Sequence, residues 1–167
     1  YLVIRHHDDE RELSFGTRSL SLKDAERIFV RVPLACGCLE SVELSGACSF
    51  ESESVLSGAK LDVDMSGASK FEAEVAVRDL DLDMSGACRV TLSGSADRVE
   101  ADGSGACNLN CRDLRAGNVS LEMSGATKGE FNAGFLDAEL SGASKICVNE
   151  DAETRISASG ASKIERY

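Results

Sequence analysis

The 167-residue sequence contains no tryptophan, two tyrosines, two histidines and one proline. Both tyrosines are terminal, Tyr1 and Tyr167, so the chain offers no aromatic platform on which a sugar ring could stack. The histidines are His6 and His7, and no histidine accompanies the serines of the later repeats to activate one as a nucleophile. No apolar run approaches the roughly 18 residues of a membrane-spanning helix. These absences argue against the commonest catalytic sites and against a membrane span.

Basic residues are also in the minority, with 18 Lys and Arg against 29 Asp and Glu and a net charge of −11. Binding to phosphate backbones requires a basic surface, so nucleic acid is not an expected ligand. The apolar fraction of 43% is that of an ordinary globular chain, long enough for a real hydrophobic core.

The sequence is organised by a repeated tripeptide, Ser-Gly-Ala. Its seven copies begin at Ser45, Ser66, Ser85, Ser104, Ser124, Ser141 and Ser159, at steps of 21, 19, 19, 20, 17 and 18 residues. Apolar residues stand one and three positions before each serine and five after it in most copies, which is the alternation of a strand with one buried face. A repeat near 20 residues with this alternation is typical of a solenoid.

We therefore predict an all-β fold, a right-handed parallel β-helix of about seven coils with about 19 residues each. Each coil would hold three short strands and three corners. Glycine supplies a corner position without a Cβ. The predicted corner glycines are Gly46, Gly67, Gly86, Gly105, Gly125, Gly142 and Gly160. Two off-phase copies, Ser57-Gly58-Ala59 and Ser93-Gly94-Ser95, predict a second corner in their coils.

The chain divides into a non-repetitive lead-in, 1–40, and the repeat region, 41–167, within one structural domain. Short strands are expected at 2–4, 13–15 and 28–34, where Pro33 marks a strand end, and the lead-in is expected to cap the first coil. The run His6 to Glu10 suggests a metal cluster, but adjacent histidines on a strand point to opposite faces, so a solvated turn is the favoured interpretation. No cap is evident after the last repeat.

Charged residues recur in phase with the serines. An acidic face is predicted from the carboxylates two and four positions before each serine: Asp62, Asp64, Asp81, Asp83, Glu100, Asp102, Glu122, Asp137 and Glu139. A basic ladder is predicted four positions after it: Lys70, Arg89, Lys128, Lys145 and Lys163. The favoured interpretation is solvated surface, and two others stay open, namely bridging of the column by Ca²⁺ through oxygen ligands and docking of a basic partner. No other cofactor is expected, and no metal site is assigned.

Seven cysteines are present, and most are expected to be buried free thiols. Cys48, Cys88 and Cys107 occupy the position after Ser-Gly-Ala where other repeats carry Ser or Thr, so they are interpreted as small fillers. Cys111 is assigned to the core, and the candidates for exposed thiols are Cys36, Cys38 and Cys147. Their spacing does not match a zinc site.

The repeated pattern Leu/Met-Ser-Gly-Ala-Ser-Lys-hydrophobic, preceded by residues 28–33 (IFVRVP) and 39–46 (LESVELSG), resembles the auto-transporter adhesin head domain (GIN domain) family. This is a family of domains of unknown function common in Bacteroidetes. The resemblance covers roughly residues 28–167 and implies a right-handed β-helix and export to the periplasm or cell surface. It brings no catalytic residues. The family's N-terminal strands with their Gly-Ile-Asn-like motif lack a counterpart, so the chain is expected to begin partway into the domain.

The prediction is a non-enzymatic, extracytoplasmic β-helix that presents charged ladder faces to a protein or glycan at the cell surface. One alternative is a polysaccharide lyase or hydrolase, because carboxylates of neighbouring coils would lie about 5 Å apart, as in retaining glycosidases. The other alternative is a structural protein that assembles by end or edge stacking.

Overall fold

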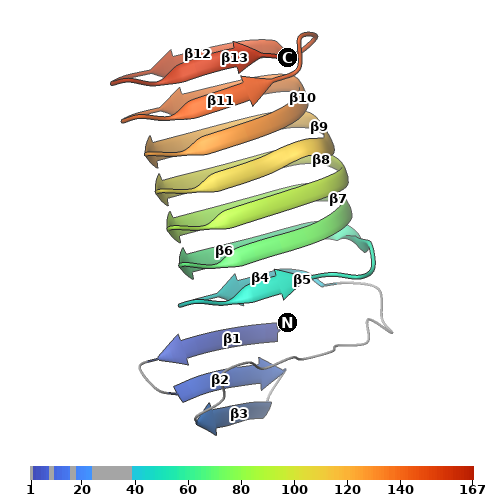
Figure 1. Cartoon of the computed structure of the whole chain (residues 1–167). Coiled ribbons are helices and arrows are strands. Elements are labelled where there is room, and N and C mark those ends of the chain that lie inside the picture. The colour runs from blue at the N-terminus through green and yellow to red at the C-terminus, as the bar shows by residue number, and fades with distance from the viewer. Residues whose placement is uncertain (1, 8–9, 16–17, 24–38) are drawn as a thin grey trace.

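The computed structural model describes residues 2–7, 10–15, 18–23 and 39–167, with side chains from Leu39 onward. All regular structure in these ranges is β, in one 13-stranded sheet. Figure 1 shows the strands wound into a solenoid whose coils stack along one axis. The strands are β1 (Leu2–His7), β2 (Glu10–Phe15), β3 (Arg18–Lys23), β4 (Ser41–Leu44), β5 (Ser49–Glu51), β6 (Leu56–Gly67), β7 (Lys70–Gly86), β8 (Arg89–Gly105), β9 (Asn108–Gly125), β10 (Lys128–Leu140), β11 (Lys145–Val148), β12 (Glu153–Ala158) and β13 (Lys163–Arg166).

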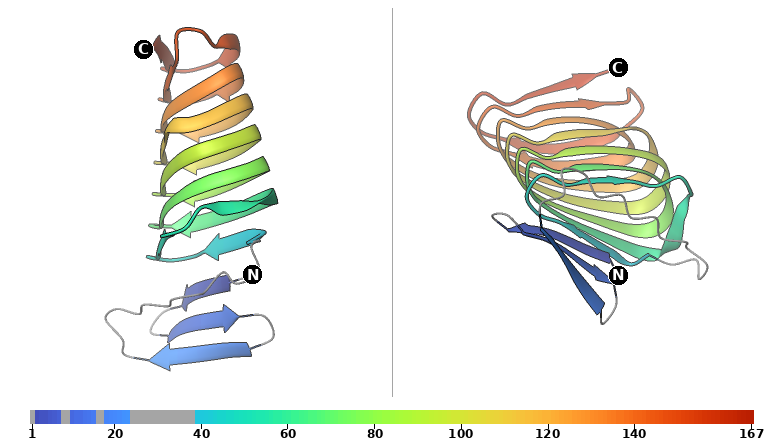
Figure 2. Two further views of the ribbon diagram at one scale, coloured as in Figure 1. Left: turned by 90° about the vertical axis from the view of Figure 1, so that its right-hand side faces the viewer. Right: turned by 60° about the horizontal axis from the view of Figure 1, so that its bottom comes forward.

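The coils stack in register, so equivalent positions of successive repeats are direct neighbours. Strands β6 to β10 pair in parallel, and Ser66 faces Ser85, which in turn faces Ser104. The two views of Figure 2 show the coils superimposed along the axis. The predicted all-β parallel solenoid with a repeat near 19 residues is confirmed.

The number of strands per coil differs from the prediction. Strand β7 runs without a break from Lys70 to Gly86, and β8 from Arg89 to Gly105, so one strand makes most of a coil. Figure 1 shows these strands curving round a smooth bend on one side and ending at a sharp corner on the other. Midway along these strands the alternation changes phase, because two residues that are not buried separate Val77 from Leu80 in β7 and Ala96 from Val99 in β8. This step of three residues instead of two is a signal in the sequence that the strand turns.

The sharp corner is the Ser-Gly-Ala tripeptide. All seven corner glycines have φ between 76° and 101°, and Gly94, within β8, has φ 102°. A Cβ on Gly86 would lie 2.5 Å from the carbonyl oxygen of Gly67 in the preceding coil. The backbone amide of the following alanine, Ala87, donates to that same oxygen at 2.7 Å. Glycine is therefore required both by the backbone conformation and by the close stacking of corners. The second off-phase glycine, Gly58, lies within β6 with no positive φ, so the predicted second corner is absent there.

The core is built from in-register columns of apolar side chains. One column contains Leu80, Val99, Val119 and Leu136, each at most 1% exposed. In another, the rings of Phe50 and Phe71 stack with centroids 4.8 Å apart. Each column continues from coil to coil, so the coils share one continuous hydrophobic core.

The described strands of the lead-in, β1 to β3, form an antiparallel meander that extends the sheet. Strand β1 pairs in parallel with β4, from Leu2 opposite Val42 to Ile4 opposite Leu44. The expected strands at 2–4 and 13–15 lie within β1 and β2, whereas β3 was not expected. The expected strand at 28–34 and residues Asp8 and Asp9 of the acidic run lie outside the described residues.

Candidate functional site

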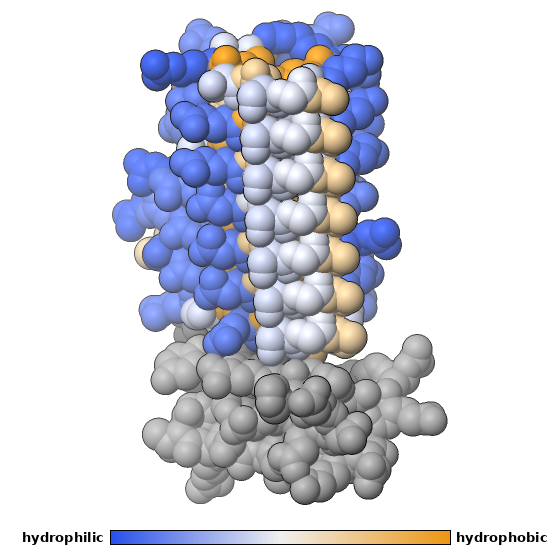
Figure 3. Space-filling model, turned by 90° about the vertical axis from the view of Figure 1, so that its left-hand side faces the viewer, coloured by the Kyte–Doolittle hydropathy of each residue, from blue (hydrophilic) through white to orange (hydrophobic). Residues whose placement is uncertain are grey.

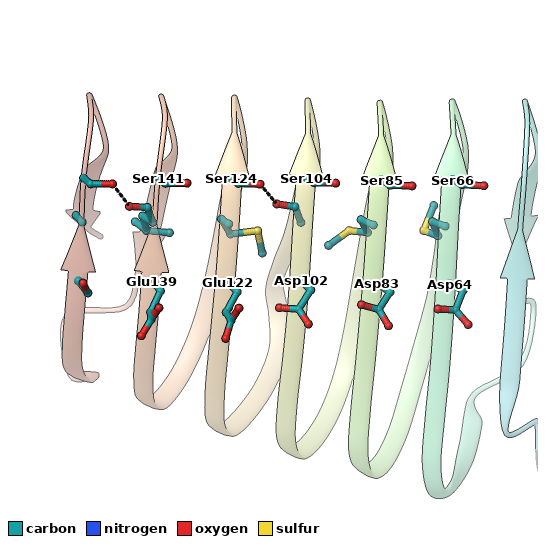
Figure 4. Close-up of a pocket in the computed structure, with 18 of the residues that line it drawn as sticks. Asp64, Ser66, Asp83, Ser85, Asp102, Ser104, Glu122, Ser124, Glu139 and Ser141 are labelled. Carbon is teal, nitrogen blue, oxygen red and sulfur yellow. Dashed lines mark hydrogen bonds between the residues drawn. The ribbon is translucent and has the colours of Figure 1, made fainter.

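A groove runs along the solenoid axis beside the sharp corners. Its volume is about 780 Å³, and residues from Glu43 in the first coil to Ser159 in the last line it. Figure 4 shows its two walls, a column of carboxylates and a column of serine hydroxyls. The carboxylate wall, called here the inner acidic column, consists of Glu43, Asp64, Asp83, Asp102, Glu122 and Glu139. The groove with these walls is called the acidic groove.

Strand geometry explains the groove. The carboxylates stand two positions before the serines, so both side chains point outward from the same face of the sheet. The residue between them points inward, and Met65, Met84 and Met123 are at most 4% exposed. The floor is therefore the strand backbone over a buried thioether column, and both walls repeat at the strand spacing of about 4.8 Å.

Five members of the inner acidic column have no cationic partner among the described residues. Among residues 39–167, no Lys or Arg forms an ion pair with Asp64, Asp83, Asp102, Glu122 or Glu139. Desolvation and the neighbouring carboxylates Asp83 and Glu43 raise the pKa of Asp64 above its ordinary value, and a hydrogen bond with Asp83 adds to the rise. The pKa of Asp102 is raised by desolvation and by Asp83. The column is a row of mutually repelling carboxylates.

The outer acidic column, four positions before the serines, is in part neutralised within the chain. It comprises Asp62, Asp81, Glu100 and Asp137 among the predicted residues. Lys60 Nζ lies 2.8 Å from a carboxylate oxygen of both Asp62 and Asp81, and these two hydrogen bonds raise its pKa. Arg155 lies 4.0 Å from Asp137. The structure therefore separates the predicted acidic face into two columns of different electrostatic character.

The basic ladder lies across the corners from the acidic groove, and it pairs with other carboxylates. Its members hydrogen-bond to glutamates on their own side: Lys70 to Glu72 at 2.6 Å and Lys128 to Glu130 at 3.0 Å. Lys145 and Lys163 both contact Glu165, at 2.8 and 2.6 Å, and lower the pKa of Glu165 to about 2. Arg89 forms no ion pair with a described residue.

Between the two charged columns lies a flat strip, called here the corner strip, which comprises the Ser-Gly-Ala tripeptides of all seven coils. Figure 3 views this side and shows the strip as three straight columns of small side chains flanked by hydrophilic residues. Its alanines are exposed in every coil. The glycines predicted as structural corners form its central column.

The groove itself was not foreseen from the sequence, because the serines were interpreted only as corner residues. Their hydroxyls face outward, two positions from the carboxylates, and this spacing was the available signal. Two of these serines donate to a backbone carbonyl of the preceding coil, Ser124 to Gly103 at 3.4 Å and Ser159 to Leu140 at 3.5 Å. The residue three positions after a corner serine donates to the carbonyl of that serine. The Ser69 hydroxyl, buried, donates to the Ser66 carbonyl at 2.9 Å, and Cys88 Sγ donates to the Ser85 carbonyl at 3.3 Å.

The five described cysteines are free, and Cys88, Cys107 and Cys111 are buried. Burial raises the pKa of Cys111 to about 12. Cys147 is half-buried, with its sulfur 3.9 Å from a Glu165 carboxylate oxygen, and Cys36 and Cys38 lie outside the described residues. Within the described part of the chain, no three His, Cys, Asp or Glu side chains come together as a metal site. The same part of the chain contains no helix long and apolar enough to cross a membrane.

A stacked parallel solenoid with a ladder-lined groove defines the class of β-helix repeat proteins. Within that class, residues 2–152 match the family described as "Putative auto-transporter adhesin, head GIN domain", and the chain belongs to this family. The match begins earlier than the resemblance at 28–167 and includes the lead-in.

A solved structure shares this architecture. It is the crystal structure of a protein from Bacteroides fragilis described as a putative adhesin, with a TM-score of 0.76 and 19% sequence identity. The alignment covers 95% of this chain and 77% of that chain, so the two share the fold. No curated protein matches the sequence.

Proposed function

We propose that the chain is a non-enzymatic binding module that acts outside the cytoplasm and contacts a cationic partner through the acidic groove. Membership of an adhesin head-domain family supports a binding role at the cell surface. The observation that carries the choice of face is that Asp64, Asp83, Asp102, Glu122 and Glu139 of the inner acidic column form no ion pair with a described Lys or Arg, whereas the outer acidic column and the basic ladder both contain ion-paired members.

Unpaired like charges at strand spacing destabilise a sheet, and here they are repeated over at least five coils. A partner that brings positive charge relieves this repulsion, and the energy so relieved contributes to the free energy of binding. Since most of these carboxylates are exposed, salt screens the attraction, and binding should weaken between low and physiological ionic strength.

The test compares two triple variants with the same change in net charge. Asp64→Asn/Asp83→Asn/Asp102→Asn neutralises the inner acidic column, and Asp62→Asn/Asp81→Asn/Glu100→Gln neutralises the outer one. Binding is measured by biolayer interferometry against immobilised basic proteins and amine-bearing glycans, with their acidic and N-acetylated counterparts as controls. We expect the inner variant to lose binding and the outer variant to keep most of it. Equal losses would mean that only net charge matters, and unchanged binding by the inner variant would remove the groove as the contact face.

Divalent cations are the second candidate for the same column, because carboxylate and hydroxyl oxygens are the ligands that Ca²⁺ takes. A cation bound only by the folded chain raises the midpoint of thermal unfolding. A rise in millimolar Ca²⁺ that EDTA reverses would favour cation bridging, and a melt that Ca²⁺ leaves unchanged would favour a macromolecular partner.

A further inference from the structure

The corner strip and its two flanks have a property that neither folding nor the acidic groove explains. The corner glycines are required by their positive φ and by the close approach of the preceding carbonyl. The alanines that follow them are under no such demand, since their side chains point into solvent in all seven coils. The positions that border the corner strip, in the inner acidic column and the basic ladder, carry long charged residues in most coils. Stacking of the coils therefore does not by itself require small side chains on the surface. The strip is nevertheless flat along its whole length.

The flanks of the strip carry opposite charge. The inner acidic column borders the serine side, with Asp64, Asp83 and Asp102 in successive coils. The basic ladder borders the alanine side, with Lys70 and Arg89 in two of the same coils. The lysines are half-exposed, and their ion pairs are of the surface kind that contributes little, so they can exchange partners at low cost.

Symmetry makes this surface complementary to itself in one orientation. A two-fold axis parallel to the solenoid axis places strip against strip and sets the acidic column of each copy over the basic ladder of the other. The opposite, antiparallel arrangement sets acidic column against acidic column. Both copies repeat at the same strand spacing of about 4.8 Å, so an acidic residue of one copy lies opposite a basic residue of the other in four coils, those of Asp64 and Lys70, Asp83 and Arg89, Glu122 and Lys128, and Glu139 and Lys145. Such an isologous contact closes after two copies.

The geometry points to a parallel homodimer in which the corner strips of two chains lie face to face. This inference rests on the proposed function, since it uses the inner acidic column as a contact face and identifies a second copy of the chain as its cationic partner. Seven coils give a strip about 34 Å long, and with its flanks it is about 15 Å wide. Roughly 500 Å² per chain is near the lower limit for specific interfaces, so the dimer should be weak and sensitive to salt.

Sedimentation velocity across a concentration series, at low and high salt and without any added ligand, tests the dimer. We expect a monomer–dimer equilibrium that shifts to monomer as salt rises. Ala87→Glu/Ala106→Glu places charge in the strip at exposed positions, and circular dichroism checks that it folds. It should raise the dimer dissociation constant about tenfold or more, the effect of losing about 1.4 kcal/mol.

Charge reversal tests the orientation. One variant carries Asp64→Lys, Asp83→Lys and Glu122→Lys, and the other carries Lys70→Glu, Arg89→Glu and Lys128→Glu. Each alone should be monomeric, and an equimolar mixture should form a heterodimer, because both contacts are then between opposite charges.

A wild-type chain that stays monomeric at low salt overturns the inference, as does a dimer that persists in either reversal variant. Either result leaves the proposed function standing if the inner triple variant still loses binding to external cationic ligands. Conversely, if the wild-type chain dimerises, the variants are monomeric and no external cationic ligand binds, the groove serves self-association only.

Discussion

Met123 lies in the space that a side chain at position 103 would occupy. A Cβ on Gly103 would lie 2.6 Å from Met123 Sδ and 3.9 Å from Met84 Cε. Gly103 stands directly before a corner serine, where the neighbouring coils carry Met84 and Met123, and Figure 4 shows that row of side chains between the two walls of the groove. The apparent gap in the repeat is therefore filled by the side chain of the next coil.

This relationship predicts strong coupling between the two positions. Gly103→Ala should destabilise the chain by about 1–3 kcal/mol through overpacking against Met123. Met123→Ala should cost about 2–5 kcal/mol through a cavity. In the double variant the new methyl group occupies part of that cavity, so the two costs should not add, with a coupling of about 0.5–3 kcal/mol in urea denaturation. Additive costs would show that Met123 does not fill this space.

Corner glycines and strand glycines should respond in opposite ways to the same substitution. Gly86→Ala forces a residue with a Cβ into φ 99° and into a 2.5 Å contact with the Gly67 carbonyl oxygen, so a loss of more than about 2 kcal/mol is expected. Gly58→Ala meets nothing closer than 3.8 Å at a position without positive φ, and it should be neutral or stabilise by up to about 1 kcal/mol. Chemical denaturation of both variants measures the contrast, and similar losses would contradict the assignment of Gly86 to a strained corner.

The sequence predicts those features of the fold that are local properties of the chain. Alternation at period 2 identified the buried columns, and the spacing of Ser66, Ser85 and Ser104 placed the corners, because both are local properties of the chain. The smooth bend was not predicted, although the alternation changes phase midway along β7, where the buried residues Val77 and Leu80 stand three positions apart instead of two. Gly129 shows a second limit: its column looks empty in the sequence, but a Cβ there would lie 2.5 Å from Phe131 Cε2, so a neighbour fills the position.

The acidic groove was predictable only in part, because ion pairing between coils is not a local property of the sequence. The sequence places carboxylates in columns, but it does not say which column finds a partner within the chain. Lys60 neutralises Asp62 and Asp81 because it stands two positions before Asp62 on the same face, whereas the equivalent places before Asp64 and Asp83 hold the acidic residues Asp62 and Asp81. Pairing depends on side-chain reach between coils, which the alternation does not encode.

The buried cysteines should differ in their tolerance of serine. Cys88 Sγ donates to the Ser85 carbonyl as the Ser69 hydroxyl does to Ser66, so Cys88→Ser keeps a hydrogen bond and should change stability by less than about 1 kcal/mol. Cys111 is equally buried, at 1% exposed, and its sulfur makes no hydrogen bond to a described residue. Cys111→Ser should therefore cost about 1–3 kcal/mol for an unsatisfied hydroxyl. Thermal melts under reducing conditions compare the two, and a larger loss for Cys88→Ser would contradict this account.

The carboxylates of the inner acidic column should make stability depend on pH with a sign opposite to that of an ion-paired glutamate. The pKa values of Asp64 and Asp102 are raised in the folded chain, so folding favours their protonated forms. Their contribution is fully present below the unfolded pKa, near 3.8, and is lost as pH rises through the raised folded value. At pH 7 both carboxylates therefore oppose folding.

Asp64→Asn/Asp102→Asn should accordingly raise the melting midpoint at pH 7 by about 1–3 °C, and the gain should disappear near pH 3. Glu165 is the matched control, because Lys145 and Lys163 lower its pKa to about 2. Glu165→Gln should lower the midpoint at pH 7, and this loss should fade as pH falls from 4.5 toward 2. Melts of the three chains between pH 2 and 7 measure both trends. If the double variant is destabilised at pH 7, the column is held by favourable contacts within the chain, and the repulsion that motivates a cationic partner is absent.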